Sequence, residues 1–312
     1  MKVGLYSIAC SGTWYRDRPA MTVEEFADFA KDVGYDGVEI DLKRPHGSPL
    51  DLNTERCKKI RSYIDDIGLE LPGVAANNNF SSPIPEQREN ELLMVREQIR
   101  VAKDLGAPVL RLFAAWPGIT FKNGLATYEA TFGNQGRYEA LDYEKKVFVY
   151  ECLKESVKWA ENDGVVLALQ NHRPVIECYQ DMLNFVEWVG SPWLRCSFDA
   201  PNLGWNEAVQ NDAYISKAVR DVGDKQAICH CSAEFTEDKN GNVRLVPWDT
   251  RYPVVVNYPT YIKTLKEVGY KGYINYEYCH IPFHFGKIQG FDYIEKQIRF
   301  ALRYLRGLTE SE

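Results

Sequence analysis

The feature that most limits the fold of this chain is a strict alternation of short apolar runs with longer amphipathic stretches along its 312 residues. The apolar runs are rich in β-branched residues and have the length of buried strands. We expect these strands at Val3–Ala9, Gly37–Asp41, Glu70–Ala76, Val109–Ala114, Val165–His172, Leu194–Asp199, Gln226–Ser232 and Tyr273–Tyr278. The stretches between them have helical spacing. We expect these helices at Val23–Val33, Thr54–Ile67, Glu86–Leu105, Tyr143–Asn162, Tyr179–Val189, Asp212–Val222, Tyr258–Val268 and Phe291–Arg306.

Eight strand–helix units in series predict an α/β fold, a closed parallel (β/α)8 or TIM barrel. Glycines such as Gly34, Gly106 and Gly164 separate a helix from the next strand, where glycine commonly ends helices. An open doubly wound sheet is the main alternative, but the lack of a Gly-rich dinucleotide loop disfavours it. We expect one domain over residues 1–312 with long loops at about 115–142 and 233–257, which are rich in aromatics and favour ordered lids or a partner-docking surface.

Composition excludes several classes of function. The net charge of −7 disfavours a nucleic-acid partner, because phosphate binding needs clustered Lys and Arg. No apolar run of about 18 residues is present, so we expect no membrane span. The N-terminal sequence lacks signal-peptide architecture, and the 8 cysteines include no CxxC pair. Reduced cysteines and a cytoplasmic location are the simplest interpretation.

All 5 histidines fall at or just beyond the end of a predicted strand. In parallel barrels the catalytic groups gather at this end of the strands. The last four strands each also end in a residue of metal-ligand type: Gln170, Asp199, His230 and Glu277. This oxygen-rich set with one imidazole suits a divalent cation, Mn²⁺ first, with Mg²⁺, Co²⁺ or Fe²⁺ as alternatives. The competing interpretation is a hydrogen-bonded polar plug satisfied by arginines.

The motifs GLYSIA, GYDGVEI, DLGAPVLRLF, LALQNH and GYINYEY occur in the order found in the xylose-isomerase-like barrel superfamily, which the whole chain resembles. That superfamily includes sugar phosphate isomerases and epimerases. Most members would have Glu at the position of Gln170, so this chain offers two anionic ligands instead of three. The cation should then be a stronger Lewis acid that is held less tightly.

Within the superfamily, KRPHGSPLDL, AANNNFSSPIPEQRENELLMVREQ and LALQNH most resemble the catalytic alpha subunits of C-glycoside deglycosidases. This resemblance implies a carbon–carbon lyase that removes the proton next to the carbonyl of a 3-oxo C-glycoside and expels the aromatic aglycone. It also implies a smaller beta subunit as partner. The alternatives are a metal-dependent sugar or sugar-phosphate isomerase or epimerase acting through an enediolate, and a catalytically silent sugar-binding or scaffold barrel.

The remaining polar and aromatic residues at the strand ends are candidates for catalysis and substrate binding. His172 is the first candidate for the base, because strand alternation puts it on the face of Gln170. His46 and His280 are further catalytic candidates, although either can instead stabilise its loop. We expect substrate contacts from a second set of strand-end residues: Asn202, Trp14, Trp116, Arg173 and His284. Glu39, also inward-facing, needs a buried partner, for which Arg111 is the candidate.

Overall fold

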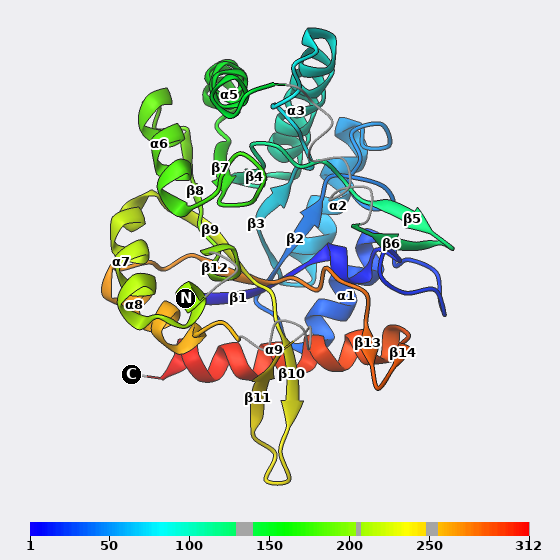
Figure 1. The fold of residues 1–312 in the computed structure, drawn as a ribbon. Coiled ribbons are helices and arrows are strands. Elements are labelled where there is room, and N and C mark those ends of the chain that lie inside the picture. Colours follow the sequence, from blue (N-terminus) through cyan, green and yellow to red (C-terminus); the bar gives the residue numbers. More distant parts are fainter. Residues whose placement is uncertain (129–139, 204–206, 248–254, 312) are drawn as a thin grey trace.

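Eight parallel strands close into a barrel in the computed structural model, which describes residues 1–311 except 129–139, 204–206 and 248–254 (Figure 1). Around the barrel the strand order is β1-β12-β9-β8-β7-β4-β3-β2. The bounds are β1 Lys2–Tyr6, β2 Gly37–Asp41, β3 Glu70–Ala75, β4 Val109–Leu112, β7 Val166–Gln170, β8 Leu194–Ser197, β9 Gln226–Cys231 and β12 Tyr273–Tyr276. The predicted TIM barrel is confirmed.

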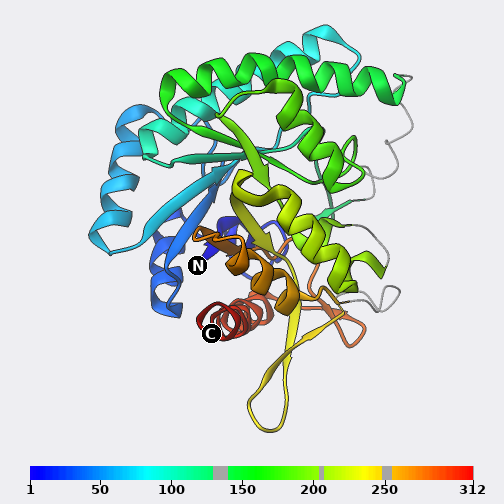
Figure 2. The same cartoon turned by 90° about the vertical axis from the view of Figure 1, so that its left-hand side faces the viewer.

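Helices surround the barrel and cover the outer face of its strands (Figure 2). Their bounds are α1 Val23–Val33, α2 Thr54–Asp66, α3 Pro85–Leu105, α5 Asp142–Asp163, α6 Tyr179–Val189, α7 Asp212–Val222, α8 Tyr258–Glu267 and α9 Phe291–Glu310. Helix α1 shows why the predicted bounds hold. Thr22 and Glu25 form a reciprocal capping box at its start, and Gly34 ends it in the left-handed conformation with φ of 104°.

All barrel strands except β2 end one to three residues earlier than the sequence pattern predicts, and β1 and β7 show two reasons. Strand β1 ends at Tyr6, and the next four residues form a 3-10 helix, Ser7–Cys10, instead of continuing the strand. Strand β7 ends at Gln170, because the backbone N–H of His172 turns back and donates to the Gln170 carbonyl at 2.8 Å. Apolar residues continue past the end of β1, so periodicity alone extends that strand too far, whereas the residues after β7 are polar and a backbone turn ends that strand.

Three small hairpins lie outside the barrel: β5 Thr120–Lys122 with β6 Leu125–Thr127, β10 Glu234–Glu237 with β11 Val243–Val246, and β13 Phe283–His284 with β14 Lys287–Ile288. The first two fall in the predicted long loops, and β10–β11 projects past α9 (Figure 1). Trp205 and Trp248, two further aromatic residues of the strand-end loops, lie outside the described residues.

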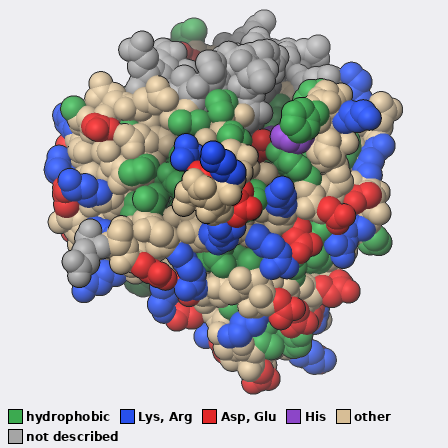
Figure 3. All heavy atoms as spheres, turned by 90° about the horizontal axis from the view of Figure 1, so that it is seen from below, with side chains coloured by type: hydrophobic (Ala, Val, Ile, Leu, Met, Phe, Trp, Pro, Cys, Tyr) green, Lys and Arg blue, Asp and Glu red, His purple; other side chains and the backbone are tan. Residues whose placement is uncertain are grey.

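On the face shown in Figure 3, basic and acidic side chains are interspersed instead of forming one basic patch. Among the helices that the structure describes, none is long and apolar enough to cross a membrane.

The strand register sets the level of the polar side chains inside the barrel. Tyr6 on β1 lies beside Glu39 on β2, and Asn275 on β12 lies beside His230 on β9. Gln170 at the end of β7 lies beside Ser197 on β8. These polar positions therefore lie near the carboxyl ends of the strands, which is the layer where barrels of this type place chemistry.

Close packing at the other end of the barrel leads to the first prediction. A Cβ on Gly37 would lie 2.7 Å from the Glu70 carbonyl oxygen and 2.9 Å from the Tyr273 ring. Gly37→Ala should therefore lower the free energy of unfolding by about 1–3 kcal/mol. Gly307→Ala is the control, because that position in α9 is open and alanine there should raise stability by about 0.5–1 kcal/mol. Denaturant melts check both, and equal stability of the two variants would contradict the packing argument.

Candidate active site

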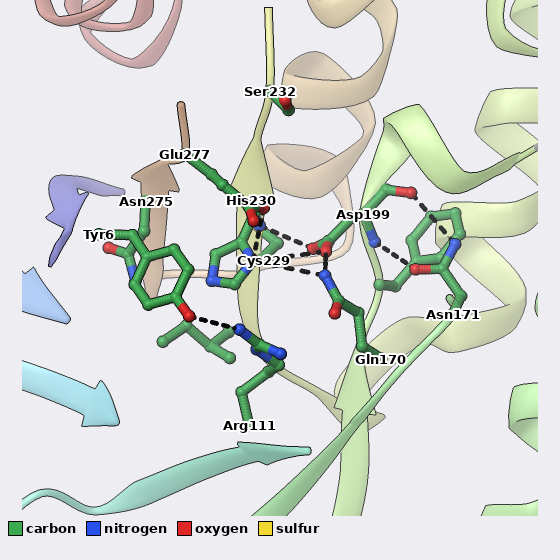
Figure 4. Close-up of polar contacts among 12 residues, drawn as sticks. Tyr6, Arg111, Gln170, Asn171, Asp199, Cys229, His230, Ser232, Asn275 and Glu277 are labelled. Atoms are coloured by element: carbon green, nitrogen blue, oxygen red, sulfur yellow. Dashed lines mark hydrogen bonds and ion pairs between the residues drawn. The ribbon is translucent and has the colours of Figure 1, made fainter. Parts of the chain in front are cut away.

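The side chains predicted as metal ligands lie together, with those of Gln170, Asp199 and Glu277 around the imidazole of His230 (Figure 4). The Nδ1 atom of His230 lies 3.5 Å from Glu277 Oε2 and 3.6 Å from Asp199 Oδ2. The amide nitrogen of Gln170 is 3.4 Å from the same Nδ1 and donates a hydrogen bond to Asp199 Oδ2. The structure therefore gathers one imidazole, two carboxylates and one amide around a single point.

Backbone contacts fix Asp199 and Glu277 in this arrangement. Asn171 and Asp199 clamp each other: the Asp199 N–H donates to Asn171 Oδ1 at 2.8 Å, and the Asn171 amide donates to the Asp199 carbonyl at 3.1 Å. The other carboxylate oxygen of Asp199 accepts from the His230 N–H at 2.7 Å. Glu277, just past β12, is held through its N–H by the Cys231 carbonyl at 2.9 Å. The cluster is therefore preorganised by neighbouring strands.

The chemistry of this donor set fits a divalent cation. In the described part of the chain, no group of three or more His, Cys, Asp or Glu has the geometry of a metal site. The side chains instead contact one another directly. Two carboxylates and an imidazole nitrogen nevertheless face one point, and the buried Oε1 of Gln170 has no hydrogen-bond partner within the described chain. Oxygen and imidazole ligands of this kind suit Mn²⁺ or a related dication.

Electrostatics in the cluster favour a proton on His230. Burial alone would lower the pKa of His230, but the nearby carboxylates of Glu39 and Asp199 outweigh burial and raise it to about 9. Burial raises the pKa of Asp199 to about 6, although His230 and the Gln170 hydrogen bond oppose this shift. A cation that binds at Nδ1 must therefore displace a proton.

The partner of Glu39 differs from the one predicted. Arg111 does not pair with Glu39 directly; its guanidinium donates to the Tyr6 hydroxyl at 2.9 Å and to the Ala76 carbonyl at 3.2 Å. Glu39 Oε2 lies instead 2.7 Å from His230 Nε2, across the barrel interior. Burial would raise the pKa of Glu39, but His230 reverses that effect and the net shift is downward. Strand alternation identified the inward face of Glu39 but not its partner.

His172 lies just past β7, against aromatic rings. One ring nitrogen, Nδ1, is bonded to the Arg173 carbonyl and must carry the proton, because a carbonyl only accepts. The lone pair is therefore on Nε2. Burial lowers the pKa of His172, which favours this neutral form at neutral pH. A neutral imidazole with a free lone pair is a competent general base.

An aromatic wall, made of Trp14, Phe113, Trp116 and Tyr128, stands beside His172. Phe113 and Trp116 meet the imidazole edge-on, with ring centroids 5.1 Å and 5.0 Å away. Tyr128 packs on Trp14 at 5.6 Å, and its hydroxyl donates to the carbonyl of Cys279, two residues beyond Glu277. The two tryptophans predicted to contact substrate therefore belong to one surface with the candidate base.

Both ring nitrogens of His46 are engaged within the protein. Nε2 donates to the Met21 carbonyl at 3.0 Å, so Nδ1 accepts from the Ser7 hydroxyl at 3.0 Å. Ser7 Oγ in turn accepts from the Asp41 N–H at 2.9 Å. In this arrangement His46 ties the loop after β2 to the 3-10 helix after β1, and its nitrogens are not open to a substrate.

Of the other predicted site residues, Asn202 contacts the backbone of Asp199, and the described contacts of His280, His284 and Arg173 are with residues outside the cluster. His280 Nε2 is 3.0 Å from Glu234 Oε1. His284 on β13 is exposed and packs against Phe285 and Tyr293. Arg173 forms an exposed ion pair with Glu177 at 3.0 Å. Asn202 lies in the 3-10 turn Ala200–Leu203, with its N–H donating to the Asp199 carbonyl.

Two residues in the site were missed by the sequence analysis. Tyr6 stacks on His230 with centroids 5.3 Å apart and planes 6° apart (Figure 4). Asn275 on β12, the strand beside that of His230, donates to Glu39 Oε2. The signal for Asn275 was a polar residue inside the apolar run YINY, whereas Tyr6 has no sequence mark that separates it from a core tyrosine.

The sequence model of the xylose isomerase-like TIM barrel family matches residues 27–307, and the chain belongs to that family. It is 24% identical over 259 residues to the fructoselysine 3-epimerase of Shigella flexneri, covering 80% of this chain and 82% of that protein. Among solved structures, the D-psicose 3-epimerase of Clostridium cellulolyticum H10 has a TM-score of 0.70 at 18% identity, with 100% of both chains covered. The 3-keto-D-glucoside 4-epimerase of E. coli has a TM-score of 0.68 at 18% identity, with 98% of this chain and 99% of that chain covered.

The buried contacts of His46 predict a pH dependence of stability. Burial lowers the folded-state pKa of His46 below its ordinary value, so its contribution is complete above the unfolded pKa near 6.5. It is lost as pH falls towards the folded pKa, by up to about 1.4 kcal/mol per pH unit. His46→Gln should therefore lose less stability than wild type between pH 7.5 and 5.5, by denaturant melts. An identical loss in both proteins would show that His46 does not titrate in this way.

Proposed function

We propose that this chain is a divalent-metal-dependent epimerase or isomerase that removes a proton from the carbon next to the carbonyl of a keto sugar. The convergence of Gln170, Asp199, His230 and Glu277 at the strand ends carries this proposal. The relatives support it, because all three reported above are named as sugar epimerases. In the 3-keto-D-glucoside 4-epimerase, the name itself places the inverted carbon beside the ketone.

In the proposed site, Asp199, Glu277, His230 and the amide oxygen of Gln170 would hold the cation. A divalent cation supplies stabilisation of the negative charge that develops on the substrate oxygen. The two anionic ligands leave more of its positive charge uncompensated than three would. Asp199 and His230 are almost completely buried, whereas 19% of the Glu277 side chain is exposed. Glu277 is therefore the ligand that faces the mouth of the barrel.

Proton transfer is assigned to His172 and Glu277. The free Nε2 lone pair of His172 accepts the proton from carbon, since Nδ1 is held by the Arg173 carbonyl. Glu277 is the candidate for the opposing group, because it is close enough to His172 to raise the pKa of that imidazole. As an ionised cation ligand it only accepts, so it would act as the acid after taking up a proton from solvent. Two groups on different strands can serve the two faces of the inverted carbon. The aromatic wall then packs against the sugar and excludes water from its reacting side.

The aromatic wall also favours a second candidate function, cleavage of a 3-oxo C-glycoside. Phe113 and Trp116 lie within stacking distance of His172, where a flat aglycone would be placed after proton removal from the sugar. The first step, removal of a proton next to a ketone, is shared with the epimerase. The lyase would next break the bond to the aromatic carbon, which takes up a proton as it leaves, and a smaller beta subunit would be the expected partner.

Solvent exchange tests both functions through their shared step. Incubation with keto sugars and a 3-oxo C-glycoside in deuterium oxide should incorporate deuterium next to the carbonyl of at least one substrate. His172→Ala should slow exchange by roughly 100-fold or more, with its metal content unchanged. Lys239→Ala, at an exposed position between β10 and β11, is the control and should exchange at the wild-type rate.

The products separate the candidates. An epimeric sugar supports the epimerase, and released aglycone, tested also with a co-expressed beta subunit, supports the lyase. Wild-type exchange in His172→Ala would contradict the role of that base. A catalytically silent barrel would be favoured if no substrate exchanges and if metal fills fewer than about a tenth of the sites. Four intact ligands should bind a cation much more completely than that.

Gln170 provides a prediction about metal affinity. Gln170→Glu adds a third anionic ligand at the point shared with Asp199 and His230, so Mn²⁺ should bind about tenfold more tightly or better, equivalent to about 1.4 kcal/mol. Gln180→Glu makes the same charge change on the exposed face of α6 and should leave the affinity as in wild type. Titration in competition with a chelator measures both, and equal affinities of the two variants would place the cation away from Gln170.

A further inference from the structure

We propose that Glu39 is a positioning residue that orients His230, so that Nε2–H points at β2 and Nδ1 faces the metal cluster. The proposal rests on the proposed function, since it assigns Nδ1 of His230 to the cation. It concerns a residue outside the four ligands, on a strand that contributes none of them. Carboxylate–imidazole pairs of this kind fix the tautomer and raise the basicity of a metal-binding histidine.

The contact between the two side chains is direct and fully enclosed. Glu39 Oε2 lies 2.7 Å from His230 Nε2, and the two side chains are 0% and 1% exposed. Strands β2 and β9 are not neighbours, because β1 and β12 stand between them in the barrel. The hydrogen bond therefore crosses the barrel interior, where water cannot replace either partner. A carboxylate can only accept, so Nε2 must donate.

Three neighbours hold this pair in one geometry. The Asn275 amide donates to the same Oε2 atom of Glu39 and sets the direction of the carboxylate. The Tyr6 ring lies parallel to the imidazole, which prevents the ring from tilting. Arg111 holds the Tyr6 hydroxyl at 2.9 Å, so the stacked ring is fixed as well. The imidazole is thus constrained at its edge and on one face.

A purely structural ion pair would also explain why a buried carboxylate is tolerated. The position of the other ring nitrogen indicates that the pair also has a role in metal binding. Nδ1 is the atom that lies 3.4–3.6 Å from Gln170, Asp199 and Glu277. With Nε2–H committed to Glu39, Nδ1 is the only ring nitrogen left to offer a lone pair once its proton is displaced. The contact with Glu39 therefore decides which nitrogen is available to the cation.

The test compares Glu39→Gln with Glu70→Gln, which removes the same charge at the opposite end of the barrel. Mn²⁺ affinity is measured by competition with a chelator in the full chain. Glu39→Gln should weaken binding by roughly 10–100-fold, while Glu70→Gln should bind as wild type does. In the NMR spectrum of the ¹⁵N-histidine-labelled protein with Zn²⁺, wild-type His230 should show a protonated Nε2 and a metal-bound Nδ1. The His230 signals are assigned because they are lost in His230→Asn. In Glu39→Gln this pattern should weaken or be replaced by mixed tautomers.

A second variant, Asn275→Ala, tests the proposal if Glu39→Gln does not fold. Asn275→Ala leaves the carboxylate in place but removes the donor that orients it, so it should weaken Mn²⁺ binding by less than Glu39→Gln yet measurably. Wild-type affinity and an unchanged ¹⁵N pattern in Glu39→Gln, or in Asn275→Ala if the first variant is unfolded, would overturn the role of Glu39. Absence of metal binding by the wild type would instead overturn the proposed function, so the two failures are distinguishable.

Discussion

The imidazole of His230 is the contact on which the rest of the site depends. It is almost completely buried, and it touches a carboxylate on each side: Glu39 at Nε2, and Asp199 with Glu277 at Nδ1. Three carboxylates this close would repel one another without a positive charge between them. The metal-free protein supplies that charge as a proton on His230, because the carboxylates raise its pKa to about 9. A bound dication would take over the same task, so the cluster is built around one exchangeable positive charge.

The sequence predicted the barrel and the convergence of the four candidate ligands because both depend on local patterns. Alternating apolar runs and helical stretches define the strands and helices, and chain order then brings the carboxyl ends of the strands to one mouth. Gln170, Asp199, His230 and Glu277 each follow an apolar run, so their convergence followed from topology alone. The end of β1 was placed too late because apolar residues continue into the 3-10 helix that follows it. The end of β7 was placed too late because a backbone hydrogen bond from His172 turns the chain.

Contacts across the barrel and between loops could not be predicted from the sequence. Alternation gives the side of the strand on which Glu39 lies, but its partner depends on the stagger of strands that are not neighbours. Glu39 therefore meets His230, not Arg111. The same limit applies to His46 and His280, whose nitrogens are bound by Ser7, Met21 and Glu234 from other segments. A position at a strand end therefore does not show whether the ring nitrogens of a histidine are open to a substrate.

The fold supports many reactions, so the site must decide between them. The cluster of candidate ligands, the lone pair on Nε2 of His172 and the aromatic wall all favour proton removal beside a carbonyl. The proposed reaction depends on a cation lying where the four candidate ligands meet. Diffraction from a crystal soaked in Mn²⁺, recorded where manganese scatters anomalously, tests that point most directly. One strong anomalous peak is expected, from a manganese ion bonded to Asp199, His230 Nδ1, Glu277 and the Gln170 amide oxygen. An empty map there, or a peak elsewhere in the barrel, would contradict the proposed metal site.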